Sequence, residues 1–173
     1  LKAPGYQDGH AAYSDPIDEQ EFVVKEINAL QKTPDWKSTA VIVAYDDSDG
    51  WYDHAYSGVT NPSDTVADAL TGTGMCGTGT PLAHEQGRCG YGPRLPFVVV
   101  SPWAKRNAVD HTLTDQSSII AFVEDNWKLP RIFGSFDSVA GSLSGLFNFA
   151  QPAKAAPNGA LFQLNPGTGR PAR

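Results

Sequence analysis

The chain has 173 residues, a net charge of −6 at pH 7 and a hydrophobic content of 40%. That length allows one domain with a sizeable core, while no apolar run approaches the about 20 residues of a membrane-spanning helix. The acidic balance argues against the basic face that nucleic-acid binding needs. We therefore expect no nucleic-acid partner and no integral membrane segment.

The first part of the chain is predicted to form a loop and then a helix. Residues 1–16 contain Gly and Pro breakers and are predicted to be loop. Residues 17–32 are predicted to be helical because acidic side chains occupy the first turns, and because Val23, Ile27 and Leu30 recur on one apolar face.

Two short strands follow, separated by a long insertion. Thr39–Tyr45 and Phe97–Val100 are apolar runs without polar alternation, which is typical of strands buried on both faces. Each strand is therefore expected to need cover on both sides and neighbours on both edges. Residues 55–92 between them are rich in Gly, Thr and Ser, and a connection of that length is usually functional or pinned by a disulfide.

The last part of the chain is predicted to hold a second helix and a tail. Residues 115–128 are expected to be helical, with Thr114 as N-cap and Leu129-Pro130 as the stop. Residues 150–173 lack periodicity and are expected to be a tail that either lies on the body or is flexible. The apolar stripe of the helix is expected to be Ile119, Phe122, Val123 and Trp127.

Asp46 and Asp47 form the strongest candidate site, because they stand side by side where the first strand ends. Open α/β sheets place their sites at such strand ends. Two adjacent anions repel unless a cation, hydrogen-bond donors or a shared proton offsets the repulsion, and a divalent metal is the simplest solution. The alternative is a structural turn, since Asp caps helices and tolerates turn dihedrals. Carboxylate ligands do not identify the metal.

Cys76 and Cys89 are the only cysteines and lie in the Gly-rich insertion. Their even count and the lack of metal-type spacing predict one disulfide. A disulfide would place the protein in the periplasm or outside the cell. The alternative is two free thiols in a cytosolic protein.

Three other patterns are interpreted as structural. Gly141-Ser-Leu-Ser-Gly145 lacks the central serine of a nucleophile elbow. Glu124-Asp125 is expected to be a solvated face or an internal salt bridge rather than a second metal site. Arg94 is expected to hold a carboxylate or the Gly-rich loop in place.

Four blocks of this sequence resemble, in order, the C-terminal half of the bacterial phosphoesterase family that contains acid phosphatases and phospholipases C. The blocks are Tyr6–His10, Thr39–His54, Tyr91–Lys105 and Asp110–Trp127. The resemblance implies an α/β fold, as the C-terminal part of an alkaline phosphatase-like three-layer α/β/α sandwich. On this basis residues 1–149 would be the C-terminal portion of a catalytic domain and residues 150–173 the extended tail.

The resemblance also implies a partner. The family's Glu-Asn metal-binding motif and hydroxyl nucleophile belong to an N-terminal part that is not in this sequence. We therefore expect a C-terminal fragment or processed chain that pairs with an N-terminal polypeptide of the same protein. The alternative is a complete small protein.

The same resemblance suggests roles for the candidate residues. Asp46 and Asp47 would bind one divalent metal, and His10 would contact phosphate or donate a proton, a task suited to an imidazole. His54 either reaches the site or is oriented by Asp53. The two other histidines, His84 and His111, are expected to be a surface residue and a structural one.

Three functions follow from these expectations. The first is a secreted or periplasmic acid phosphatase acting on phosphate monoesters, the branch that the blocks resemble more closely. The second is a phospholipase C acting on phospholipid phosphodiesters. The third is a catalytically inactive processed fragment. The negative net charge does not exclude a phosphate ester substrate, because a metal or local Arg and His can reverse the field in a pocket.

Overall fold

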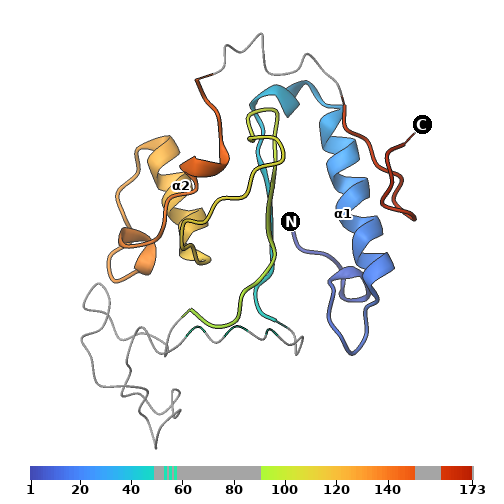
Figure 1. The fold of residues 1–173 in the computed structure, drawn as a ribbon, viewed down its shortest axis with the longest axis horizontal. Helices are drawn as coiled ribbons and strands as arrows, with labels where there is room; N and C mark the ends of the chain where they lie inside the picture. The colour runs from blue at the N-terminus through green and yellow to red at the C-terminus, as the bar shows by residue number, and fades with distance from the viewer. Residues whose placement is uncertain (49–52, 54, 56, 58–90, 151–160, 173) are drawn as a thin grey trace, which may run out of the picture. The chain divides into compact units, whose positions relative to one another are not determined.

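A computed structural model describes residues 1–48, 53, 55, 57, 91–150 and 161–172 (Figure 1). They belong to two compact units. The first comprises 1–52, 97–106 and 148–173, and the second comprises 53–96 and 107–147. No helix among the described residues is both long and apolar enough to cross a membrane.

The first unit contains helix α1, Pro16–Gln31, which confirms the predicted helix with a shift of one residue. Its start is set by Asp15, whose Oδ1 accepts hydrogen bonds from the backbone N–H groups of Ile17 and Asp18 at 2.8 and 2.9 Å. Pro16 at the first helical position has no N–H to satisfy, and Asp18 favours the positive end of the helix dipole. Short 3-10 turns flank the helix at Gly5–Gln7 and Pro34–Ser38.

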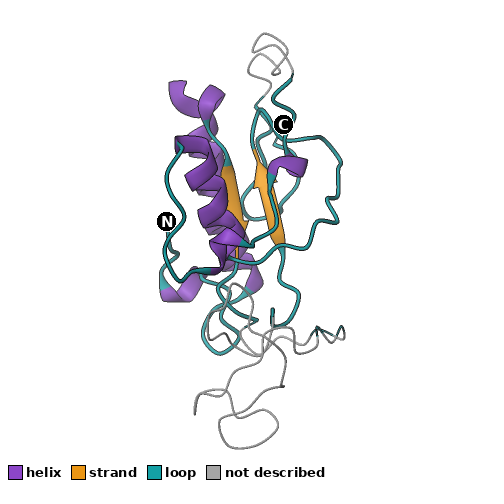
Figure 2. Cartoon of the chain, turned by 90° about the vertical axis from the view of Figure 1, so that its left-hand side faces the viewer, coloured by secondary structure: helices purple, strands orange, loops and turns teal. Residues whose placement is uncertain are grey.

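Strands β1, Val41–Ala44, and β2, Phe97–Val100, form an antiparallel pair (Figure 2). The register runs from Val41 opposite Val100 to Ala44 opposite Phe97. Both strands were expected, although β1 is shorter than Thr39–Tyr45. The Ser101 hydroxyl extends the pairing by donating a 2.7 Å hydrogen bond to the carbonyl of Thr39.

The expected burial of both strand faces is not found within the part of the chain that the structure describes. No residue of either strand is fully buried, and Val98 is 51% exposed. The described sheet has two strands, so each lacks a neighbour along one edge there. The described elements therefore make a small α/β unit, too small to provide both layers of cover.

Residues 161–172 lie along α1 (Figure 1). The Asn28 amide donates to the Leu164 carbonyl at 2.7 Å and accepts from the Leu164 N–H at 3.2 Å. The Gln20 and Gln31 side chains donate to the backbone carbonyls of Pro166 and Phe162. Glutamine and asparagine side chains on one helix face thus satisfy backbone carbonyls of this segment, which also folds back on itself through a bridge between Leu164 and Pro171.

The second unit contains helix α2, Ser117–Trp127. The prediction of Thr114 as N-cap is wrong, because the helix starts later and its cap residue, Gln116, makes no side-chain cap bond. Asp115 caps the helix start instead, because its Oδ1 accepts a hydrogen bond from the Ser117 N–H at 2.8 Å. The helix ends at Trp127, and the left-handed backbone of its cap residue Lys128 lets the Leu129 N–H reach the Glu124 carbonyl at 2.8 Å.

The buried face of α2 differs from the predicted stripe. Ser118, Ala121 and Glu124 are its buried residues, whereas Trp127 is 65% exposed. Phe122 does contribute, because its ring stacks on the buried Phe147 at a centroid separation of 5.1 Å. The core of this unit therefore combines α2 with the segment 136–147, which includes short 3-10 turns at Phe136–Ser138 and Ser144–Leu146.

Candidate functional site

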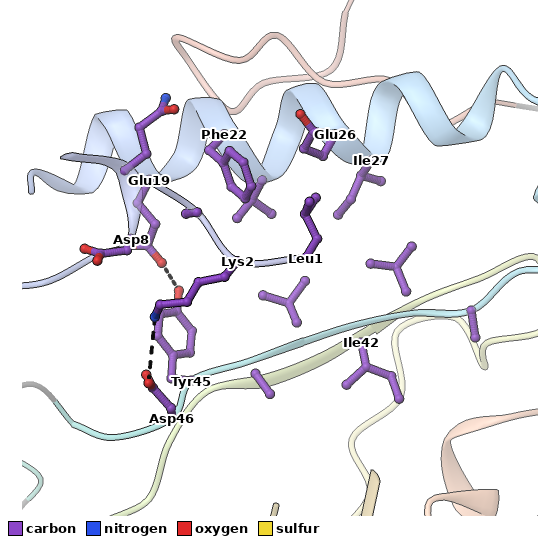
Figure 3. A pocket seen from close by; sticks show the side chains of 17 residues that line it. Leu1, Lys2, Asp8, Glu19, Phe22, Glu26, Ile27, Ile42, Tyr45 and Asp46 are labelled. Carbon is purple, nitrogen blue, oxygen red and sulfur yellow. Dashed lines mark hydrogen bonds and ion pairs between the residues drawn. The ribbon is translucent and has the colours of Figure 1, made fainter. Parts of the chain in front are cut away.

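A cavity of about 500 Å³ lies in the first unit, between the N-terminal segment, α1 and β1 (Figure 3). Its apolar wall is formed by Phe22, Val23 and Ile27 of α1, which face the side of β1. Polar side chains gather at one end, where the strand finishes. They are Lys2, Asp8, Glu19, Tyr45 and Asp46.

Asp46 and Asp47 lie in a bend that begins one residue after the end of β1, with Tyr45 between them and the strand. The Asp46 carboxylate lines the cavity and is 87% exposed, and the ammonium of Lys2 lies 3.8 Å from it. Ion pairs as exposed as this one contribute little to stability. The Asp46 side chain is thus largely exposed to solvent at the end of the strand.

His10 lies in a tight turn of the same unit. Its backbone N–H donates to Asp8 Oδ1 at 3.0 Å, and its Nδ1 accepts from the Ala12 N–H at 3.1 Å. Because Nδ1 is an acceptor, a neutral ring carries its proton on Nε2. The ring stacks on Tyr13 with centroids 4.1 Å apart. His10 is not a lining residue, but Asp8, two positions earlier, shares the cavity with Asp46.

Glu19 and Tyr45 form a contact that the sequence patterns did not predict. The Tyr45 hydroxyl donates a hydrogen bond to Glu19 Oε1 across the cavity (Figure 3). Burial, followed by this hydrogen bond, raises the pKa of Tyr45 to about 12. The spacing could have indicated that Glu19 faces the strand, because Glu19 precedes Phe22 and Val23 by three and four positions and so shares their helix face.

His54 lies outside the described residues, so its part in the site stays a prediction. Asp53 is described, in the second unit, and its carboxylate is bound by Arg94, whose Nε and Nη2 donate at 3.1 and 3.0 Å. This confirms that Arg94 holds a carboxylate. Hydrogen bonds from the Arg94 side chain, followed by those from the Ala55 and Arg94 backbone, hold the pKa of Asp53 well below its usual range.

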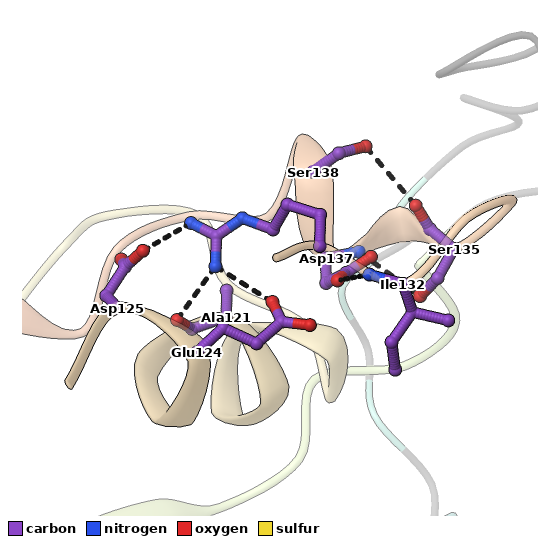
Figure 4. A network of polar contacts seen from close by, with 8 residues as sticks. Ala121, Glu124, Asp125, Ile132, Ser135, Asp137 and Ser138 are labelled. Atoms are coloured by element: carbon purple, nitrogen blue, oxygen red, sulfur yellow. Dashed lines mark hydrogen bonds and ion pairs between the residues drawn. The ribbon is translucent and has the colours of Figure 1, made fainter. Parts of the chain in front are cut away.

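A second polar cluster joins Arg131 to Glu124 and Asp125, two of the residues labelled in Figure 4. Arg131 Nη1 donates to Glu124 Oε2 at 2.8 Å and to the Ala121 carbonyl at 3.0 Å, while Nη2 donates to Asp125 Oδ1 at 2.6 Å. Glu124 is almost fully buried, and a buried carboxylate needs such a partner. Of the two alternatives predicted for Glu124-Asp125, a solvated face or an internal salt bridge, the structure shows the salt bridge.

The described residues do not form a complete metal site by themselves. No group of three or more His, Cys, Asp or Glu residues that could hold a metal ion is found among them. Asp46 and Asp47 supply two carboxylates, fewer than the ligands that a divalent ion requires. Cys76, Cys89 and His84 lie outside the described residues, and His111 is exposed.

Comparison with known proteins identifies a family to which this sequence is similar. A model described as the Phosphoesterase family matches residues 1–130. The non-hemolytic phospholipase C of Pseudomonas aeruginosa is 32% identical over 163 residues, which cover 88% of this chain and 23% of that protein. The non-hemolytic phospholipase C of Burkholderia pseudomallei is 34% identical over 143 residues, covering 76% of this chain and 20% of that protein.

A plant relative shows the same relation. The non-specific phospholipase C4 of Arabidopsis thaliana is 29% identical over 162 residues, covering 87% of this chain and 27% of that protein. The chain thus spans about a fifth to a quarter of the length of these relatives. Since the family match covers most of the sequence, including the Asp8, His10, Asp46 and Asp47 blocks, the chain belongs to the phosphoesterase family.

Proposed function

We propose that this chain supplies part of the active site of a phosphoric ester hydrolase. The observation that carries the proposal is that Asp8, two positions before His10, and Asp46, next to Asp47, line one cavity. Two family blocks that are far apart in the sequence therefore meet at the end of β1. His10 Nε2 would stabilise the transferring phosphate oxygens or protonate the leaving group.

The metal remains part of the proposal. Asp46 and Asp47 would supply two oxygen ligands to one divalent ion, and the other ligands would come from polypeptide beyond this sequence. Such an ion would neutralise charge on the phosphate oxygens. Asp46→Asn and Asp47→Asn in the complete protein should each lower metal content and activity by orders of magnitude while leaving the unfolding midpoint close to the wild-type value. Wild-type metal content by elemental analysis in both variants would overturn this assignment.

Two substrate classes follow, each with its own support. A phospholipid phosphodiester is favoured by the names of the relatives, which are phospholipases C. A phosphate monoester, hydrolysed by an acid phosphatase, is favoured by the closer resemblance of the motif blocks to that branch. Hydrolysis rates of the complete protein on a chromogenic phosphate monoester and on phosphatidylcholine vesicles decide between them. Inactivity on both substrates of the 173-residue chain, isolated under denaturing conditions and refolded, would support the third possibility, a catalytically inactive processed fragment.

The nucleophile is proposed to come from an N-terminal polypeptide of the same protein. That polypeptide would complete an alkaline phosphatase-like α/β/α sandwich by pairing with the edges of the β1–β2 sheet and covering its partly exposed strands. Mixing separately purified halves should restore hydrolysis that neither half shows alone. Hydrolysis by the 173-residue chain alone would overturn this division and direct the search to its own Ser and Thr residues.

Export to the periplasm or the cell exterior is proposed together with a Cys76–Cys89 disulfide. The support is the even cysteine count and the bacterial origin of related phospholipases C. Non-reducing peptide mapping of freshly isolated protein should find the two peptides joined. Recovery of both thiols free would refute the pairing.

A further inference from the structure

The Glu19 carboxylate lies between two segments that carry candidate catalytic residues. On one side, Oε1 accepts the hydrogen bond from the Tyr45 hydroxyl (Figure 3). On the other side, Oε2 lies against Gly9, so close that a Cβ built on Gly9 would sit 3.0 Å from it. Tyr45 directly precedes Asp46 and Gly9 directly precedes His10, so one side chain reaches both blocks.

The Gly9 side of this arrangement is constrained by its own backbone. Gly9 has a φ of +87°, a backbone conformation that residues other than glycine rarely adopt. Its N–H donates to the Ser14 hydroxyl at 3.1 Å, and the Gln7 amide donates to the Asp18 carbonyl at 3.2 Å. The turn that carries His10 is thus fastened to the first turn of α1, where Glu19 also lies.

The Tyr45 side has a different support. The strand ends at Ala44, so no β1–β2 ladder bond orients the residues that follow it. The bond from Tyr45 to Glu19 ties this strand exit to α1 at the position just before Asp46. Stabilising the positive end of the helix dipole does not explain the bond from Glu19 to Tyr45, because Asp18 already places a carboxylate in the first turn of α1.

We propose that Glu19 is a positioning residue that fixes the spacing between the His10 turn and the Asp46-Asp47 strand exit. The inference rests on the proposed function, in which these residues act on one phosphate group. Glu19 itself does not touch the substrate. It acts through Tyr45 and through its packing against Gly9, and its removal should therefore impair turnover rather than substrate binding.

The test uses the complete protein and four variants: Glu19→Ala, Glu19→Gln, Tyr45→Phe and the Glu19→Ala/Tyr45→Phe double variant. Misplacing reacting groups by about 1 Å can cost roughly 100-fold in rate. We expect a fall in kcat of about 10- to 100-fold for Glu19→Ala and for Tyr45→Phe, with KM within about threefold of wild type. Glu19→Gln keeps an acceptor oxygen and should recover most of kcat. The double variant should be no slower than the slower single variant.

Glu21→Gln is the matched control. Glu21 lies on the same helix, pairs with Lys25 at 2.8 Å and does not line the cavity. The same change of charge there should leave kcat within about twofold of wild type. Equal kcat values for Glu19→Ala and Glu21→Gln would overturn the positioning role. So would a double variant whose loss in kcat is the product of the two single losses.

Amide hydrogen exchange separates this inference from the proposed function. Glu19→Ala should increase exchange both at residues 8–10 and at residues 44–47, while Glu21→Gln should change neither segment. If the wild-type protein hydrolyses no phosphate ester, the proposed function fails, but the exchange result still decides whether Glu19 holds the two segments. Exchange unchanged at either segment would overturn the inference.

Discussion

The Asp53 carboxylate is held by a fork of donors. Arg94 Nε and Nη2 donate to its two oxygens, and the backbone N–H groups of Arg94 and Ala55 donate at 2.8 and 3.0 Å. Bidentate guanidinium–carboxylate contacts of this kind are stronger than single ones. All of these donors favour the ionised form of Asp53.

An acid dependence of stability follows from this contact. Because the pKa of Asp53 is lower in the folded protein than in the unfolded chain, its contribution is fully present above about pH 3.9, the unfolded value. It is lost as the pH falls through the folded-state value. Asp53→Asn should therefore lower the free energy of unfolding at pH 7, and its difference from wild type should shrink as the pH falls below 4.

Urea unfolding of wild type and variant over a pH series measures this difference. Arg94→Ala removes the main donor and should flatten the acid dependence in the same way. A stability difference between wild type and Asp53→Asn that stays constant from pH 7 to pH 2 would contradict the assignment.

Gly141 and Gly145 show, at the scale of elements, why the Gly-Ser-Leu-Ser-Gly segment is structural. A Cβ on Gly141 would lie 1.9 Å from the Leu113 carbonyl oxygen, and one on Gly145 would lie 1.7 Å from Asp110 Oδ2. The segment therefore needs glycine to approach residues 110–113 closely. Leu143 between the two glycines is 2% exposed and anchors the contact in the core.

Gly141→Ala should destabilise the protein by about 1–3 kcal/mol, the usual cost of forcing extra volume into a packed site. The backbone carbonyl of Leu113 has to move, because it is not a flexible side chain. Denaturant unfolding measures the change. Gly167→Ala is the control, since its Cβ would meet its nearest neighbour at 3.7 Å. Equal stability of the two variants would contradict this explanation.

Asn28 binds residues 161–172 to α1. Its amide makes two hydrogen bonds with the backbone of Leu164, and each such bond contributes about 0.5–1.5 kcal/mol. Asn28→Ala should raise the rate of amide exchange at Leu164 about 10-fold or more. Lys25→Ala, at an exposed position on the same helix, should leave that rate unchanged. Protection of Leu164 that survives Asn28→Ala would show that other contacts hold the segment.

At the scale of the whole molecule, many large apolar side chains are exposed. Phe133 is fully exposed, and Val109, Phe162 and Leu113 are more than 60% exposed. Extensive exposed apolar surface marks an interaction site or an aggregation risk. The 173-residue chain on its own should therefore bind a hydrophobic dye such as ANS and should associate at micromolar concentration, as light scattering with size-exclusion chromatography would show. A monomeric chain without dye binding would contradict this expectation.

Local patterns predicted the elements better than their partners. The apolar run before Asp46 predicted β1, and the acidic first turn with its apolar periodicity predicted α1, because both depend on nearby residues. The antiparallel pairing of β1 with β2 and the bond between Glu19 and Tyr45 join distant positions, and no local periodicity encodes them. The buried face of α2 was misjudged for another reason, because a periodicity of apolar residues does not mark a carboxylate such as Glu124 as buried, and its partner Arg131 lies beyond the helix.

The pairing of β1 with β2 also bears on how the chain folds. Residues 45–96 separate Ala44 from Phe97, so about fifty residues must be closed into a loop before the first ladder bond forms. The entropy of closure grows slowly with length, by about 0.6 kcal/mol for each doubling. Halving the insertion would therefore change equilibrium stability little. It would, however, lower the mean sequence separation of contacts, and such chains reach the native state faster.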